Sequence, residues 1–313
     1  MSIFATYGRK NSGLKYNKRI IIMVSIGSSE LILNSDGSIY HLHLSPGELA
    51  HDIIVVGDPG RVPVISAYFD RIELKRQNRE IFTHTGYIGK KRLSVLSTGM
   101  GTDNIDIVLN EIDALFNVDL QKRVPKKEHT PLNIIRLGTS GALQTDIKVD
   151  SMVASTHGIG LDGMLYYYRD APTVIDTELT KAFVDQTSWN HEFPRPYVVA
   201  ASEHLLKIIA HDFVRGITAT APGFYGPQGR VLRLPAKHTD LNLALTNFNA
   251  SGKRIINFEM ETSALYGLGR LLGHQTLTVC AIIANRITQT YSKDYQVTIK
   301  KLIETLLERM ERL

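Results

Sequence analysis

The chain has 313 residues, of which 36 are Lys or Arg and 31 are Asp or Glu, so its formal net charge is +5. Residues 1–29 hold five of the cations and no acid, which leaves the rest of the chain electrically neutral. Although the pI is near 9.1, the basic excess lies in a terminal segment, so composition gives no support for binding to nucleic acid. With 43% hydrophobic and 21% charged residues, this length allows one large α/β domain or two small ones.

Cysteine content and hydropathy indicate the cellular environment in which the protein is expected. Cys280 is the only cysteine, so no disulfide can form within the chain, which is typical of a reducing compartment. The apolar run at residues 20–24 is shorter than the roughly 7–15 residues of a signal-peptide core. No segment approaches the roughly 18 continuous apolar residues of a membrane span. We therefore expect a soluble, cytoplasmic protein that has no membrane partner.

The beginning of the chain differs from the rest. Residues 1–34 are rich in Gly, Ser, Asn and Lys and show no sustained periodicity, as in a flexible extension or a leader segment. The remainder has the pattern of a globular protein. We predict an extension over residues 1–34 and one domain over residues 35–313.

Strands and helices are predicted to alternate along this domain. Residues 52–56 form an apolar run that ends at a Gly-Asp-Pro-Gly turn, and residues 62–69 then show a helical pattern. The polar residues 121–131 are expected to form a solvated surface insertion. Such alternation predicts an α/β sheet protein. Further strands are expected at residues 81–88, 93–97, 133–137, 151–155, 196–200, 216–220 and 276–283, and further helices at residues 105–116, 177–189, 202–213, 261–272 and 294–313.

Several common catalytic signatures are absent from the sequence. It has no phosphate loop of the Gly-x-x-x-x-Gly-Lys-Ser/Thr type, no His-Glu-x-x-His, no paired cysteines and no Gly-x-Ser-x-Gly. Of the eleven histidines, only His41 and His43 are a close pair, and no acid or cysteine stands beside them at ligand spacing. We therefore expect chemistry without a metal or an organic cofactor, based on positioning and electrostatics.

Two arginines near glycine-rich turns indicate an anion. Gly57-Asp58-Pro59-Gly60-Arg61 places backbone amides and a guanidinium where a strand leads into a helix, although turns of this kind are common. Arg136 lies in an apolar strand and needs a counter-charge there, so a structural salt bridge would explain it equally well. Two converging guanidinium groups would suit phosphate oxygens. Phosphate is therefore the first predicted ligand.

A motif before a predicted helix suggests a sugar site. In Asn257-Phe258-Glu259-Met260-Glu261, the Glu261 carboxylate could accept hydrogen bonds from sugar hydroxyls while Met260 packs on the sugar face. Acids at the start of a helix are also ordinary complements of the helix dipole. Both interpretations remain open on this motif alone.

A glycine-rich loop suggests a base site. Gln228 offers one acceptor and two donors and Arg230 offers donors only, which together match the acceptor-donor-acceptor edge of uracil. Phe224 would provide a stacking wall. Cytosine would place a donor against Arg230. A surface loop without function is the alternative.

Several motifs, taken in order, resemble the uridine phosphorylases of the nucleoside phosphorylase-I group. The resemblance covers some 270 residues, from about Tyr40 to the end of the chain, and the ordered set is far more specific than any one motif. The matching motifs are Gly57-Asp58-Pro59-x-Arg61, Arg79-Glu80, Ser97-Thr98-Gly99-Met100-Gly101, Arg136-Leu137-Gly138-Thr139-Ser140-Gly141-Ala142-Leu143-Gln144, Leu161-Asp162-Gly163, Phe224-Tyr225-x-x-Gln228-x-Arg230, Glu259-Met260-Glu261 and Asn285-Arg286.

This resemblance implies a fold, an assembly and a set of site residues. The fold would be a single α/β domain in which a mixed sheet closes into a distorted barrel flanked by helices. Homo-oligomers, either dimers or hexamers, would share each active site between subunits. Phosphate would be bound by Gly57, Arg61, Arg136 and Thr139, with Arg79 from the neighbouring subunit; ribose by Met260 and Glu261, with His41 from the neighbour; and the base by Phe224, Gln228 and Arg230, with Arg286 near O4.

The implied reaction is phosphorolysis of uridine to uracil and ribose 1-phosphate, a step of pyrimidine salvage, with deoxyuridine and thymidine as further candidate substrates. Arg136, Glu261 and Arg230 would carry the catalysis. Purine-specific relatives tend to have an aspartate where this chain has Arg286. The alternatives are a purine nucleoside phosphorylase or a nucleosidase of the same fold, and a nucleoside-binding protein without activity.

One family feature does not transfer directly. Some relatives bind a monovalent cation through the residue equivalent to Glu80 and have Gly-Gly-Pro-Ser or Gly-Ile-Pro-Ser nearby. This chain has Gly101-Thr102-Asp103-Asn104 at that place. The resemblance therefore does not decide whether a cation binds at Glu80.

Overall fold

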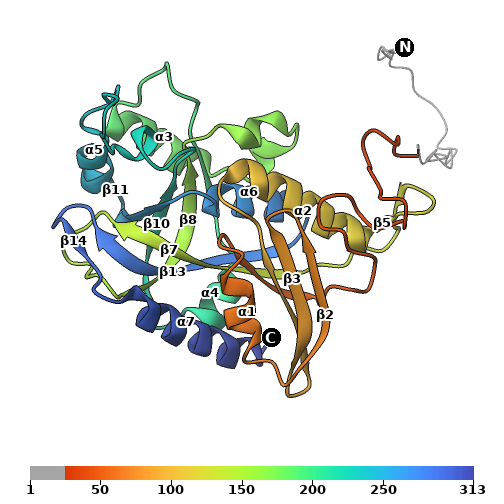
Figure 1. Cartoon of the computed structure of the whole chain (residues 1–313). Helices are drawn as coiled ribbons and strands as arrows, with labels where there is room; N and C mark the ends of the chain where they lie inside the picture. Colours follow the sequence, from red (N-terminus) through yellow and green to blue (C-terminus); the bar gives the residue numbers. More distant parts are fainter. Residues whose placement is uncertain (1–24) are drawn as a thin grey trace, which may run out of the picture.

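The computed structural model describes residues 25–313 (Figure 1). The predicted extension falls on residues 1–24, which lie outside the described part, and on residues 25–34, which contact the domain. There the Ile26 backbone N–H donates to the carbonyl of Arg123 (2.7 Å), and Arg123 Nη1 donates to the carbonyl of Leu31 (2.6 Å). The Leu31 side chain is buried. The described start of the chain is thus attached to the predicted insertion.

Strands and helices alternate along the described chain, as in the predicted α/β class. The strands are β1 (Asp52–Val56), β2 (Arg71–Asn78), β3 (Ile81–Ile88), β4 (Lys91–Ser97), β5 (Val118–Asp119), β6 (Val124–Pro125), β7 (Asn133–Ala142), β8 (Met152–Gly160), β9 (Tyr197–Ala200), β10 (Val214–Thr220), β11 (Asn249–Ala250), β12 (Lys253–Glu259), β13 (Gln275–Asn285) and β14 (Thr290–Tyr291). The α-helices are α1 (Arg61–Ser66), α2 (Thr102–Asn117), α3 (Thr177–Thr187), α4 (Glu203–Ile209), α5 (Leu241–Asn247), α6 (Thr262–Leu271) and α7 (Tyr295–Met310).

One mixed sheet organises the domain. Its strands follow the order β11-β12-β10-β8-β13-β7-β1-β4-β3-β2. Strand β12 also pairs antiparallel with β7, through Asn257 opposite Ala142 and Phe258 opposite Gly141, and this pairing closes β12, β10, β8, β13 and β7 into a barrel. Helices α2 and α6 cover one side of the sheet, and α1, α4 and α7 cover the other (Figure 1). The predicted barrel with flanking helices is confirmed.

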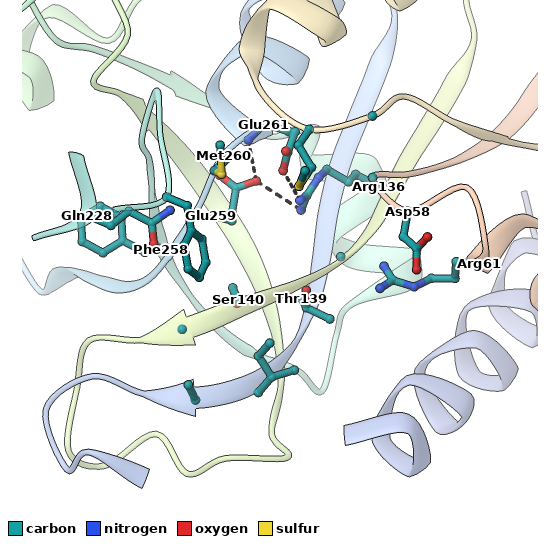
Figure 2. A pocket seen from close by; sticks show the side chains of 18 of the residues that line it. Asp58, Arg61, Arg136, Thr139, Ser140, Gln228, Phe258, Glu259, Met260 and Glu261 are labelled. Atoms are coloured by element: carbon teal, nitrogen blue, oxygen red, sulfur yellow. Dashed lines mark hydrogen bonds and ion pairs between the residues drawn. The ribbon is translucent and has the colours of Figure 1, made fainter. Parts of the chain in front are cut away.

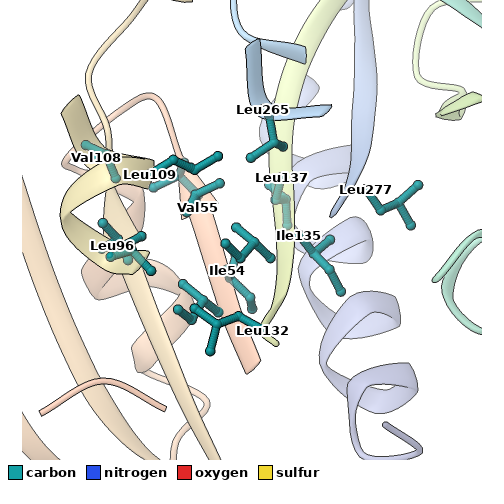
Figure 3. Packing of buried hydrophobic residues seen from close by; sticks show 14 of the residues in the cluster. Ile54, Val55, Leu96, Val108, Leu109, Leu132, Ile135, Leu137, Leu265 and Leu277 are labelled. Carbon is teal, nitrogen blue, oxygen red and sulfur yellow. The ribbon is translucent and has the colours of Figure 1, made fainter. Parts of the chain in front are cut away.

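The hydrophobic core holds the central strands between these helices. Every residue of β1 is buried, because a central parallel strand is covered on both faces. Figure 3 shows Ile54 of β1, Leu137 of β7, Leu109 of α2 and Leu265 of α6 in one cluster. Among the described residues, no helix combines the length and apolar character that a membrane crossing requires.

Strands β2 and β12 were not predicted from hydrophobic patterning, and neither were helix α5 and the two-residue strands β5, β6, β11 and β14. Strand β2 has exposed polar and charged side chains alternating with half-buried ones. Strand β12 begins with Lys253 and Arg254 and carries the buried polar residues Asn257 and Glu259, so it lacks a continuous apolar run. Both depart from the pattern on which the predictions relied.

The sheet brings the ends of several strands to one edge. Strands β4, β1, β7 and β13 are mutually parallel, with Val56 opposite Ser97 and Val55 opposite Arg136. The turn after β1, the turn after β4 and the second half of β7 therefore lie together. Ligands of α/β sheets commonly bind at the carboxyl ends of strands.

Candidate active site

A pocket of about 750 Å³ opens at this edge. Figure 2 shows Asp58 and Arg61 at one end of it, Gln228 and Phe258 at the other, and Arg136 and Glu261 between them. The predicted site residues that line the pocket are Gly57, Arg61, Arg136, Thr139, Phe224, Gln228, Arg230, Met260 and Glu261, and Glu80 lies at it as well. The fold therefore assembles most of the predicted residues around one cavity.

The first end of the pocket is formed by the turn between β1 and α1. Asp58 Oδ1 accepts a hydrogen bond from the Gly60 backbone N–H (2.8 Å), which stabilises the turn. Arg61 Nη1 donates to the carbonyl of Leu137 on β7 (3.3 Å), so the guanidinium is directed across the strand ends. Burial lowers the pKa of Arg61, while the Asp58 carboxylate acts in the opposite direction.

Arg136 occupies the centre of the pocket wall and is only 5% exposed. Its Nη1 lies 3.2 Å from Glu259 Oε2, its Nη2 forms an ion pair with Glu261, and Nη1 also contacts Cys280 Sγ (3.4 Å). Burial alone would lower the pKa of Arg136, but the Glu261 and Glu259 carboxylates outweigh it and raise that pKa. The salt bridge considered for Arg136 is thus present, and it lies in the pocket.

The Arg136 guanidinium needs a glycine two residues further along β7. Side chains two residues apart in a strand lie on the same face. A Cβ atom on Gly138 would overlap Nη1 and lie only 2.8 Å from Cζ of Arg136. The absent side chain of Gly138 therefore lets the guanidinium lie flat along the strand.

Glu259 also lines the pocket, although no role was predicted for it from the sequence. Its oxygens accept hydrogen bonds from the Glu261 backbone N–H (2.9 Å), the Thr262 backbone N–H (2.9 Å) and Thr220 Oγ1 (2.7 Å). Burial raises the pKa of Glu259, although the nearby Arg136 opposes this. The sequence did contain a sign of this role, because Glu259 precedes Glu261 by two residues in the same motif.

Glu261 is held from two sides. Its Oε1 accepts a hydrogen bond from the Gly101 backbone N–H (2.8 Å) at the start of α2, and its Oε2 pairs with Arg136. Gly101 has a φ of 104°, a conformation that is strained for other residues. Met260 lies next to this carboxylate and is half-buried in the pocket wall.

The second end of the pocket carries a paired amide and guanidinium. Arg230 Nη1 donates to Gln228 Oε1 and also to the carbonyl of Phe224 (2.8 Å). The Arg230 guanidinium stacks on the Phe224 ring, with Cζ 3.8 Å from the ring centroid, so one face of the predicted stacking wall is already covered. Burial and the charge of Arg286 lower the pKa of Arg230 to about 10. Phe258, also at this end, was not predicted to contact a ligand.

Three predicted residues lie outside the pocket lining. Arg286 is close by, since its Nη1 donates to the carbonyl of Gln228 (3.3 Å). His41 and Arg79 lie elsewhere but near each other, because Asn78 Nδ2 donates to the carbonyl of His41 (2.9 Å) and Arg79 Nη2 donates to Tyr40 Oη (3.3 Å). His41 Nδ1 lies 2.6 Å from Glu111 Oε1. The fold does not bring His41 and Arg79 to this chain's own pocket.

A family model described as the phosphorylase superfamily matches residues 52–313. The chain belongs to this family. A uridine phosphorylase of Thermococcus kodakarensis is 30% identical over 274 residues, covering 85% of this chain and 84% of that protein. A purine nucleoside phosphorylase of Clostridium perfringens is 29% identical over 273 residues, covering 86% and 97%.

A solved structure supports the same family assignment. The nucleoside phosphorylase of Trypanosoma brucei, described as showing uridine phosphorylase activity, is 32% identical and superposes with a TM-score of 0.82 over 90% of this chain and all of that one. The predicted family and fold are confirmed for this member of the phosphorylase superfamily.

Replacing Gly138 with alanine tests the geometry around Arg136. The added methyl group should displace the guanidinium, weaken binding of inorganic phosphate by about 10- to 100-fold and lower the free energy of unfolding by about 1–3 kcal/mol. Isothermal titration calorimetry and urea denaturation measure these effects. The control is Gly27→Ala, where a methyl group meets nothing closer than 3.8 Å. Unchanged phosphate affinity in folded Gly138→Ala would contradict the assignment.

Proposed function

We propose that this protein catalyses the phosphorolysis of uridine to uracil and ribose 1-phosphate, a pentosyl transfer in pyrimidine salvage. Inorganic phosphate is the co-substrate, and no organic cofactor or metal takes part in the reaction. Gln228 and Arg230 carry the proposal, because they offer a pattern suited to uracil in the same pocket as Arg61 and Arg136. The free, buried Cys280 suits a reducing compartment, and we place the protein in the cytoplasm.

The hydrogen bond between Arg230 and Gln228 determines which donor and acceptor groups are available to the base. Arginine can only donate, so the oxygen of the Gln228 amide faces Arg230 and the NH₂ group points away. The side chains then present a donor, an acceptor and a donor in a row. Uracil offers the complementary acceptor, donor and acceptor at O2, N3 and O4, whereas cytosine would place its amino group against a donor.

The reaction follows from the charges along the pocket. As the N-glycosidic bond breaks, its electron pair moves to the uracil ring, where Gln228 and Arg230 stabilise the negative charge. The ribose gains cationic character, and phosphate held by Arg61, Arg136, Gly57 and Thr139 attacks C1′. Aligning phosphate with C1′ supplies much of the acceleration.

The ribose lies between these two ends. Glu261 is fixed by Arg136 and the Gly101 N–H, so its oxygens are positioned to accept hydrogen bonds from ribose hydroxyls. Met260 packs on the sugar face. Because Glu261 is already ordered, little entropy is lost when the sugar binds.

Charge balance supports an active site shared between subunits. Three arginines and four carboxylates line the pocket, so the chain alone supplies no net positive charge for a phosphate dianion. An Arg79 side chain from a neighbouring copy would supply one. Arg79 suits this role because it is exposed at the turn between β2 and β3. We therefore propose a dimer, or a hexamer built from dimers, in which Arg79 and His41 complete the neighbour's site.

The reaction is tested by incubating the protein with uridine, deoxyuridine, thymidine, cytidine and inosine, with and without inorganic phosphate, and measuring free base. Uracil should be released from uridine only when phosphate is present. Release without phosphate would indicate a nucleosidase, and release of hypoxanthine would indicate a purine enzyme. Saturable binding without release would indicate a binding protein.

Arg230→Ala separates the role in reading the base from a role in folding. Losing the donor that stabilises the leaving group should lower kcat/KM for uridine at least about 100-fold, while the melting temperature changes little. Arg233→Ala is the matched control, because Arg233 is an exposed arginine of the same loop. Parallel losses of activity and stability, or an equal loss in Arg233→Ala, would contradict the proposed role.

The shared site is tested by mixing two inactive variants. Arg79→Ala and Arg61→Ala should each abolish turnover, but a mixed dimer retains one site with both arginines. Co-expression should therefore restore about a quarter of wild-type activity, since half of randomly formed dimers are mixed and each has one intact site of two. If activity stays absent in mixed dimers isolated with two affinity tags, Arg79 does not serve the neighbour's site.

A further inference from the structure

Three segments distant in sequence bring together Asp113, His129 and His274. Asp113 lies on α2, His129 lies in the polar segment before β7, and His274 lies between α6 and β13. Each offers one ligand atom, and the three atoms all lie within 4.8 Å of one another. None lines the active-site pocket, and along α2 Asp113 is roughly 16 Å from the first helical residue, Thr102. Imidazole nitrogens with a carboxylate oxygen are a ligand set that zinc and related divalent metals favour.

His274 has a nitrogen without a hydrogen-bond partner. Its side chain is fully buried, and Nε2 lies 3.2 Å from Asp113 Oδ1 without a hydrogen bond between them. Two ligands at about 2.0–2.1 Å from a tetrahedral zinc ion are about 3.3 Å apart. The separation of Nε2 and Oδ1 is therefore already close to that of two ligands on one ion.

His129 completes the set from the solvent side. Its Nε2 bonds to the carbonyl of Leu272 (2.8 Å), which places the ring proton there and leaves Nδ1 with a free lone pair. A backbone carbonyl that holds the outer nitrogen in this way is typical of metal-binding histidines. The rings of His129 and His274 stack, with centroids 5.6 Å apart. Gly273 is needed here, because its φ is +77° and a Cβ atom would lie 2.9 Å from His129 Cε1.

We propose that Asp113, His129 and His274 bind one divalent transition-metal ion of the zinc class, with solvent completing its coordination. Binding moves the His274 proton from Nε2 to Nδ1, so the long hydrogen bond of 3.3 Å from the Leu132 N–H to Nδ1 is lost. The metal bond satisfies the buried Nε2 and offsets the loss of that weak contact. This ion takes no part in the reaction of the pocket.

The role of this ion is to fasten the surface insertion. His129 belongs to that insertion, whereas Asp113 lies on α2 and His274 lies between α6 and β13. Asn117 already joins the two, since its Nδ2 donates to Asp113 Oδ1 (2.7 Å) and its Oδ1 accepts from the Thr130 N–H (2.7 Å). The described start of the chain is attached to the same insertion through Arg123. A bound ion should therefore stabilise both the insertion and the described start of the chain.

The test uses chelator-treated protein without a histidine tag, titrated with Zn²⁺ by calorimetry and with Co²⁺ by visible absorption. Wild type should bind one equivalent, show the absorption of a low-symmetry Co²⁺ site and gain melting temperature with Zn²⁺. His129→Ala and Asp113→Asn should each weaken binding at least about 10-fold and lose the stabilisation. His204→Ala, an exposed histidine on α4, should behave as wild type.

These measurements test the metal site independently of the reaction in the pocket. His274 is left intact because its burial makes misfolding a competing explanation, and circular dichroism verifies that the other variants are folded. If wild type binds no Zn²⁺, or if His129→Ala and Asp113→Asn bind it as tightly as wild type, the site does not exist. Uridine turnover in both variants should equal that of wild type, because neither residue touches the pocket.

Discussion

The site depends on one buried ion-pair cluster, in which Arg136 lies between Glu259 and Glu261. Removing one partner of a buried pair strands the other charge, at a typical cost of about 3–5 kcal/mol. The cluster therefore fixes β7, the end of β12 and the start of α6 relative to one another. Asp58 and Arg61 lie on one side of this cluster, and Gln228 and Phe258 lie on the other (Figure 2).

Motifs at strand ends made much of the site predictable from the sequence. Arg61 follows β1 and Arg136 lies on the parallel strand β7, so sheet geometry brings their guanidinium groups to one edge. Gln228 and Arg230 are two residues apart, and their complementary donors and acceptors could be read directly. These features depend on local sequence and on the direction of neighbouring strands.

Other features depend on tertiary structure and gave no readable signal. Strand β12 was missed because Asn257 and Glu259 are polar yet buried, and their hydrogen-bond partners Ser140 and Thr220 lie on other strands. The grouping of His129 with His274 joins residues 145 positions apart, so a search for close histidine pairs could not find it. The proposed contribution of Arg79 to a neighbouring copy would likewise be a property of the assembly.

A crystal structure of the protein with inorganic phosphate and uracil would show whether Arg61 and Arg136 bind the anion while Gln228 and Arg230 bind the base. We expect phosphate within hydrogen-bonding distance of both the Arg61 and the Arg136 guanidinium groups, and uracil with its O2, N3 and O4 edge on Gln228 and Arg230. An Arg136 that contacts only Glu259 and Glu261 while phosphate binds elsewhere would contradict this expectation.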